Sequence, residues 1–253
     1  MSYTILTQYI IKQGIKVFGT KGEAALQKEL QQFHYRRIVK PKKSQDLSYK
    51  QRRRSLTYLM FLKLKVDKVT IKGKGCAHGR KHRDWISKED TTLPTVSTEC
   101  LMLSCMIDAT EGREVATANI PGAFLQTDYY KGDIHTKMEV VMVTLLEEID
   151  LEYYKYFIYT DKLGLKCMHA ESNKAIYVTL EASLLFWEKL SEILEEMGYQ
   201  RNEYDWCFMK NIIDENQCTI IWNVNDLNTL HVDPAFISSV LADIYADYGK
   251  IEK

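Results

Sequence analysis

Apolar residues recur at three- and four-residue steps in six stretches of the chain, and this spacing predicts helices. The predicted helices cover residues 23–35, 48–65, 98–111, 145–156, 184–197 and 234–248. Ser97 and Asp233 stand where N-caps are expected, and Gly112 and Gly198 stand where two of these helices should end. The apolar face of the third helix consists of Leu101, Met102, Cys105, Met106 and Ala109.

Shorter apolar or alternating runs between turn residues predict strands. They cover residues 69–79, 114–119, 138–143, 175–180 and the two arms of a hairpin at 220–230. The hairpin is the most informative of them. Its apolar run enters a two-residue turn at Asn225 and Asp226 and leaves through Leu227, because Asn and Asp tolerate the positive φ of tight turns. A second strand, much earlier in the chain, also ends at a short polar residue, Asn119.

Length and composition limit the class of protein. The 253 residues are 45% hydrophobic and 27% charged, which is ordinary for a globular protein with a sizeable core. No apolar run approaches the roughly eighteen residues of a membrane span, and the N-terminal residues lack the pattern of a signal peptide. The six cysteines show no paired spacing, which favours reduced thiols in an intracellular protein, cytoplasmic or nuclear, without a membrane partner.

The formal net charge of +0 conceals an uneven distribution. Between Lys40 and Arg83, fifteen Lys and Arg stand against two acidic residues, which favours a polyanionic partner. The alternative is a solvated, partly disordered arm. The glycine-rich stretch 69–79 predicts a β-ribbon whose backbone and lysines approach phosphates. The expected nucleic-acid-binding residues are Lys72, Lys74, Arg80, Lys81 and Arg83.

A metal site is a further possible interpretation of this basic ribbon. Cys76, His78 and His82 are close in sequence and are all of metal-ligating types. A fourth ligand is missing nearby, however, and the spacing matches no established zinc pattern. The sequence therefore gives little support to a zinc site here.

Six segments, in order, resemble motifs of the reverse transcriptases of copia-type retrotransposons. The basic fingers ribbon of that family resembles Lys72–Gly79, and its S-P-T/V segment resembles Leu93–Ser97. Its first catalytic strand, which ends D-(I/V)-x-x-A-F-L, is similar to Asn119–Leu125. The other three are its palm helix, its D-x-C-x-F strand and its V-D-D-L/I hairpin, which resemble Leu185–Leu190, Asp205–Phe208 and Val224–Leu227.

This resemblance implies an α+β fold with reverse-transcriptase-like fingers and a ferredoxin-like palm, an antiparallel sheet with helices packed on one face. We expect a basic helical leader over residues 1–68 and the fingers and palm over residues 69–253, without a thumb. The implied activity is that of an RNA-directed DNA polymerase, and the implied partner is an RNA or DNA template-primer. The sequence does not indicate an oligomeric state.

In that family, aspartates of the first strand and the hairpin bind two Mg²⁺ ions that catalyse nucleotide transfer. Here Asn119 and Asn225 stand at two of those positions, and Asp226 alone keeps its carboxylate as a weak, residual Mg²⁺ site. Asp128 is acidic and near in sequence, but we expect it to point elsewhere. A template-positioning segment is shortened around residues 180–184. The expectation is a degenerate and truncated copy without polymerase activity.

Two alternatives stay open at this stage. The chain could be a non-catalytic nucleic-acid-binding protein that uses its basic segment. It could also be an active polymerase with an altered metal site, for example one that uses Mn²⁺ or a rescuing acid.

Overall fold

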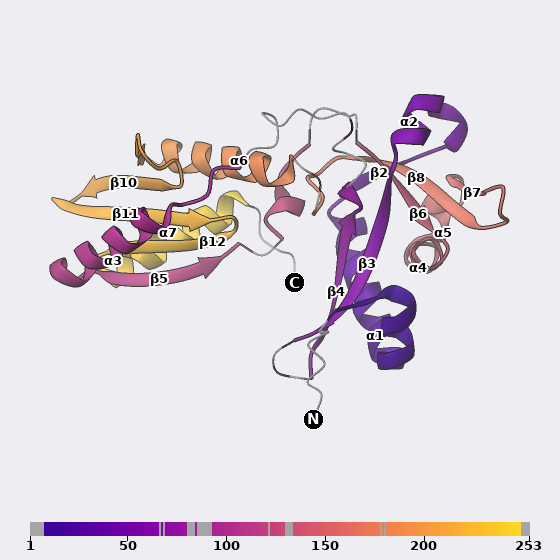
Figure 1. Ribbon diagram of the computed structural model, residues 1–253, viewed down its shortest axis with the longest axis horizontal. Coiled ribbons are helices and arrows are strands. Elements are labelled where there is room, and N and C mark those ends of the chain that lie inside the picture. Colours follow the sequence, from indigo (N-terminus) through magenta and orange to yellow (C-terminus); the bar gives the residue numbers. More distant parts are fainter. Residues whose placement is uncertain are drawn as a thin grey trace. The chain divides into compact units, whose positions relative to one another are not determined.

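The structure is a computed structural model that describes residues 8–65, 67, 69–79, 84, 93–120, 122–129, 134–177, 179 and 181–248. The chain forms two compact units, each with its own sheet and helices (Figure 1). Unit 1 comprises Met1–Ile86 and Asp128–Leu180, and unit 2 comprises Ser87–Thr127 and Glu181–Lys253. The α+β class is thus confirmed. The division differs from the expected boundary at residue 68, because the first part of the chain belongs to the sheet of unit 1.

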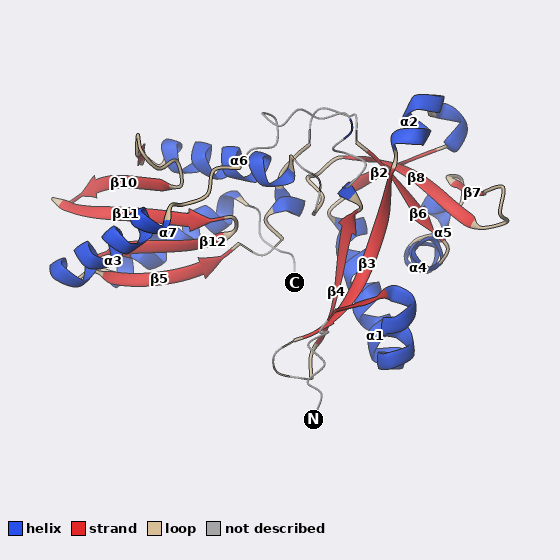
Figure 2. Ribbon diagram, in the orientation of Figure 1, coloured by secondary structure: helices blue, strands red, loops and turns tan. Residues whose placement is uncertain are grey.

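Unit 1 is built around a seven-stranded sheet in the order β1-β3-β6-β8-β2, with β4 paired to β3 and β7 paired to β8 (Figure 2). Its strands are β1 Gln8–Ile10, β2 Val39–Lys42, β3 Leu56–Leu64, β4 Ile71–Ala77, β6 His135–Glu139, β7 Ile158–Thr160 and β8 Lys166–Ser172. Its helices are α1 Ile11–Tyr35, η1 Ser44–Asp46, α2 Tyr49–Arg54, α4 Val141–Ile149 and α5 Leu151–Tyr154. The strand pair β3–β6 is parallel, and the other pairs are antiparallel.

Glycines let α1 approach β3 and β4 closely. A Cβ added to Gly73 would lie 2.7 Å from the carbonyl oxygen of Ala25, and one added to Gly14 would lie 2.7 Å from the Leu62 side chain. The carbonyl oxygen of Ala25 belongs to the helix backbone, so no side chain fits at Gly73, whereas a side chain at Gly14 would require Leu62 to shift. Gly73 therefore serves helix packing and Gly75 makes room for the ring of Tyr58 on β3, and the prediction that the ribbon backbone approaches phosphates is not supported at Gly73.

The helix predicted over residues 48–65 is wrong. Only α2 is helical there, with a capping box at Ser48, and Leu56–Leu64 is the strand β3. Its buried and partly exposed side chains alternate up to Lys63, with Leu56 and Leu62 in the core. Apolar residues fill almost every position of this stretch, so they satisfied a helical spacing as well as the alternation of a strand.

Two other boundaries in unit 1 also differ from the prediction. The strand expected over 138–143 is β6, which ends at Glu139, and α4 begins at Val141. Val140 between them has a φ of 29°, which turns the chain sharply. The described residues of 175–180 form no strand, and the hairpin of this region instead pairs β7 with β8.

Unit 2 is an antiparallel sheet in the order β5-β12-β11-β10-β9, and its described residues also form three α-helices and one short 3-10 helix. Its strands are β5 Glu114–Asn119, β9 Gln200–Arg201, β10 Phe208–Ile213, β11 Asn216–Asn223 and β12 Asp226–His231. Its helices are α3 Thr98–Glu111, η4 Phe124–Gln126, α6 Ala182–Glu196 and α7 Pro234–Asp247. The predicted caps are confirmed, since Ser97 and Asp233 accept hydrogen bonds from backbone amides of α3 and α7 and Gly112 adopts a φ of 64°.

The helices of unit 2 reach both faces of its sheet. Cys218 accepts a hydrogen bond from Tyr199, just after α6, and the next residue, Thr219, accepts one from Arg113, just after α3. Successive side chains of a strand point to opposite faces. The expectation of helices on one face only is therefore wrong for α3.

Among the described residues, no helix has both the length and the apolar character that a membrane span needs.

Candidate functional site

Three polar residues form a row across the end of the unit 2 sheet. Asp226, the first residue of β12, is the register partner of Asn119 on β5 and of Asn223 on β11. Register partners in an antiparallel sheet carry their side chains on the same face. All three side chains are exposed. We call Asn119, Asp226 and Asn223 the terminal row.

A short hydrogen bond joins two members of the terminal row. The amide nitrogen Nδ2 of Asn119 donates to Oδ1 of Asp226 at 2.6 Å. Because the acceptor is a carboxylate, this bond is charge-assisted. The same end of β5 is held by two further bonds: Tyr245 Oη donates to the carbonyl of Asn119 at 3.1 Å, and the amide of Ile120 donates to the carbonyl of Asn225 at 3.2 Å.

The hairpin turn lies one residue earlier than predicted. Its two central residues are Val224 and Asn225, and Asp226 already belongs to β12. Val224 has a φ of 58°, in the left-handed region that a β-branched residue rarely adopts. A positive φ at the first central residue alone is the pattern of a type II′ turn, which favours glycine there. The sequence therefore places a strained valine beside the terminal row.

The shift of the turn changes which residues meet. Asn119 and Asp226 come together as expected, whereas Asn225 occupies the turn itself and is half-exposed. Asn223, which was not among the predicted site residues, joins the row in its place. In a two-residue hairpin, the residues that flank the turn pair with each other, so a turn placed at Val224 and Asn225 would have pointed to Asn223.

The terminal row does not fit a site for two magnesium ions. Mg²⁺ prefers anionic oxygen ligands in near-octahedral geometry. Asp226 is the one carboxylate of the row, and an N–H of Asn119 occupies one of its oxygens. Asp128 does not contribute within unit 2, since it belongs to unit 1, where its carboxylate pairs with Lys174 at 2.5 Å. Across the described part of the chain, no three His, Cys, Asp or Glu side chains are grouped to hold a metal.

Basic residues of the β3–β4 pair share one face. Lys63 and Lys72 are register partners, and Lys74 follows two residues after Lys72, so the three side chains point the same way. All three are exposed. We call them the lysine face. Lys74 also lies 5.0 Å from the ring centre of Tyr177.

Of the other residues expected to bind nucleic acid or metal on the basic ribbon, the structure describes only Cys76 and His78. Arg80, Lys81 and Arg83 lie outside the described residues, as does His82. Cys76 is buried, whereas His78 is exposed.

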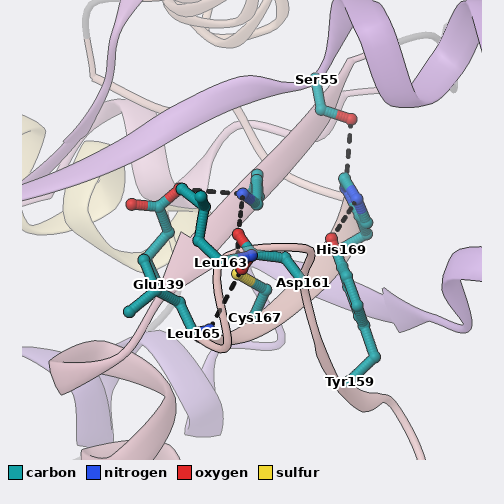
Figure 3. Close-up of polar contacts among 9 residues, drawn as sticks. Ser55, Glu139, Tyr159, Asp161, Leu163, Leu165, Cys167 and His169 are labelled. Atoms are coloured by element: carbon teal, nitrogen blue, oxygen red, sulfur yellow. Dashed lines mark hydrogen bonds and ion pairs between the residues drawn. The ribbon is translucent and has the colours of Figure 1, made fainter.

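A second polar cluster in unit 1 surrounds the buried His169 (Figure 3). Ser55 Oγ donates to the carbonyl of Gln51 at 2.9 Å, so at 3.2 Å it can only accept from Nδ1 of His169. Nε2 then accepts from Tyr159 Oη at 2.8 Å. This network fixes a neutral imidazole. Burial, reinforced by positive charges such as that of Lys137, lowers the pKa of His169 to about 4.

The ammonium group of Lys137 pairs with the two carboxylates of this cluster. Its Nζ lies 3.0 Å from Glu139 and 3.4 Å from Asp161. Burial lowers the pKa of Lys137, but its interactions with these carboxylates outweigh that effect. The pKa of Lys137 therefore lies above its ordinary value. Burial raises the pKa of the neighbouring thiol of Cys167, which is fully buried. A buried thiol with a raised pKa is a poor nucleophile, so the cluster is a satisfied polar network of the sheet.

A comparison with protein-family models finds no match for this chain, and a comparison with curated proteins finds none either. The terminal row and the lysine face are therefore interpreted from their own geometry.

Proposed function

We propose that the chain is a reverse-transcriptase-like domain, related to the RNA-directed DNA polymerase of copia-type retrotransposon polyproteins, and that it does not transfer nucleotides. The order of the six sequence motifs supports the relationship. The juxtaposition of Asn119 and Asp226 at the end of β5 and at the β11–β12 hairpin also supports it, since the resemblance places two metal-binding aspartates at those positions.

The hydrogen bond between Asn119 and Asp226 is the observation that carries the proposal. Two carboxylates at such a separation repel each other and require a cation or a proton between them. The amide of Asn119 supplies an N–H to Asp226 instead, and this satisfies the carboxylate without a metal ion. A site that is satisfied in this way has lost the charge that offsets two divalent cations.

Calorimetric titration with Mg²⁺ tests the proposal. Wild-type protein should show no binding at low millimolar Mg²⁺, and Asn119→Asp should bind measurably more tightly. Asn119→Asp combined with Asn223→Asp should improve binding further, because both residues flank Asp226 in the terminal row. Wild-type binding in the micromolar range that Asp226→Ala abolishes would refute the proposal and favour an active polymerase with an altered metal site.

A second candidate function, non-catalytic binding of nucleic acid, is favoured by the lysine face. Lys63, Lys72 and Lys74 present three exposed ammonium groups on one face of β3–β4. Phe61 is the register partner of Lys74 on the same face, and Tyr177 contacts Lys74, so aromatic rings accompany these charges. Charged and aromatic side chains together suit weak, sequence-independent binding of a single strand. A salt-dependent binding assay tests it.

A further inference from the structure

Helix α3 has its polar side turned inward and its apolar side turned outward. Ser104 and Asp108 are its buried residues. Its large apolar side chains are exposed: Met102 by 59%, Leu103 by 59%, Met106 by 68% and Ile107 by 39%. A helix on a sheet normally buries its apolar face, so this arrangement is reversed. Apolar side chains that gather in this way on a surface mark an interaction site.

A buried polar network holds α3 in this orientation. Ser104 Oγ donates to Asp108 at 3.2 Å, and Arg113 lies 3.7 Å from the other oxygen of Asp108. Arg113 also donates to Thr219 Oγ1 on β11 at 3.2 Å. Rolling the helix to bury its methionines would break these contacts and leave Asp108 unpaired, which is costly in the interior. The apolar face therefore cannot be hidden within unit 2.

The N-terminus of α3 is pinned to a rigid loop that exposes two aromatic side chains. The backbone N–H and hydroxyl of Ser97 both donate to Asp205, at 2.8 and 3.0 Å. Asn202 accepts from the amides of Tyr204 and Asp205, at 2.8 and 3.1 Å. The loop is thus held by its own hydrogen bonds, yet Tyr204 is 96% exposed and Trp206 is 54% exposed. These bonds hold the backbone at Tyr204 and leave its ring in solvent, whereas the ring of Trp206 stacks on Trp187 of α6. Exposed aromatic side chains are typical of protein interfaces.

The charges on α3 and this loop are of one sign. Residues 97–111 and 202–207 contain no Lys or Arg. The exposed charged residues are Glu99 and Glu111 at the two ends of α3 and Glu203 in the loop; Glu111 pairs with Arg113. A methionine-rich apolar face with acidic residues at its edges complements a helix that has an apolar face and basic flanks.

We propose that the exposed face of α3, together with Tyr204, is a docking surface for a basic amphipathic helix of a partner protein. Leu103 and Met106 contact the apolar face of that helix, and Glu99 and Glu203 pair with its lysines or arginines. This inference goes beyond the proposed function and does not depend on it.

The test measures binding of two labelled helical peptides to the full chain by fluorescence anisotropy. Both carry leucine at i, i+3, i+4 and i+7, and the remaining positions are lysine in one peptide and glutamate in the other. The basic peptide should bind in the micromolar range and at least about tenfold more tightly than the acidic one.

Leu103→Ser and Met106→Ser should each weaken binding about tenfold. Ile212→Ser is the control, since Ile212 is 63% exposed on β10 and should change binding less than about twofold.

Three results would overturn the proposal. The first is no micromolar binding of the basic peptide. The second is equal binding of both peptides, or binding that Leu103→Ser and Met106→Ser leave unchanged. The third is a wild-type dimer in sedimentation that Leu103→Ser converts to a monomer, because it would assign the face to contact between two copies of this chain. The substituted side chains are exposed, so each variant should keep the wild-type thermal unfolding profile, which is measured in parallel.

Discussion

Asn119 and Asp226 lie directly opposite each other on β5 and β12, and an amide N–H of the first donates to a carboxylate oxygen of the second at 2.6 Å. The two residues come from parts of the sequence that are far apart, and the sheet brings them to one edge. Every property that we propose for the terminal row depends on this pair.

The first prediction concerns Asn119→Asp. Without divalent cations, two carboxylates will oppose each other across the strands, so the free energy of unfolding should fall by about 1–2 kcal/mol. Addition of Mg²⁺ should restore part of this loss, because a cation then lies between the carboxylates. Thermal unfolding in EDTA and in excess Mg²⁺ measures both effects.

Thr117→Asp is the matched control for this prediction. Thr117 lies two residues before Asn119 on the same strand and is opposite Asn228, so its new carboxylate faces an amide. Its stability should not depend on Mg²⁺. An Asn119→Asp variant that is as stable as wild type in EDTA would contradict the structure of the pair.

The second prediction concerns the strained turn. Val224→Gly removes a side chain from a residue with a φ of 58°. The relief of about 1–3 kcal/mol exceeds the entropic cost of glycine, about 0.5–1 kcal/mol, so the variant should be more stable by about 1 kcal/mol. Chemical denaturation measures this difference.

Asn225→Gly is the control for this prediction. Asn225 has no positive φ to relieve, so this variant should be neutral or destabilising. Equal effects of the two variants would argue against strain at Val224.

The third prediction concerns pH. The pKa of His169 is about 4 in the folded protein and near 6.5 when unfolded, so the unfolded state binds more protons between these values. The free energy of unfolding should therefore fall as pH decreases from about 6.5 to 4, by about 2–3 kcal/mol in total from this residue. His169→Gln should lose that part of the pH dependence and keep the part due to carboxylates. Parallel pH profiles for the two proteins would show that His169 is not held neutral.

The fourth prediction concerns the lysine face. Binding of a single-stranded oligonucleotide should weaken with salt with a slope of log K against log salt of about −2, which corresponds to three phosphate contacts. Lys72→Gln with Lys74→Gln should reduce the slope to about −0.7. Lys162→Gln, an exposed lysine in the β7–β8 loop, is the control and should leave it unchanged. Binding that is insensitive to salt would mean that these lysines form only a solvated face.

Local signals predicted much of unit 2. Ser97, Gly112 and Asp233 mark helix ends through their own side chains or backbone, so α3 and α7 were correctly placed. The meeting of Asn119 with Asp226 was instead implied by the resemblance to copia-type reverse transcriptases, because no local pattern relates two strands so far apart in the sequence. Asn223 was missed because Val224 adopts a positive φ that its residue type disfavours, so the turn was placed one residue too late.

Features that depend on tertiary contacts could not be predicted in the same way. The stretch Leu56–Leu64 fits both a helix and a strand, and pairing with β1, β4 and β6 decides for the strand. Gly73 looked like a residue for ligand approach, but its neighbour is the backbone of Ala25 on α1. The orientation of α3 depends on Arg113 and Thr219, whose contact joins distant parts of the chain.

Primer extension tests the central proposal most directly. The assay uses an RNA template, a DNA primer and either Mg²⁺ or Mn²⁺, with an active reverse transcriptase as positive control. Because Asn119 satisfies Asp226 without a metal ion, we predict no extension by the wild-type chain with either ion. Extension by the wild-type chain that Asp226→Ala abolishes would contradict this account.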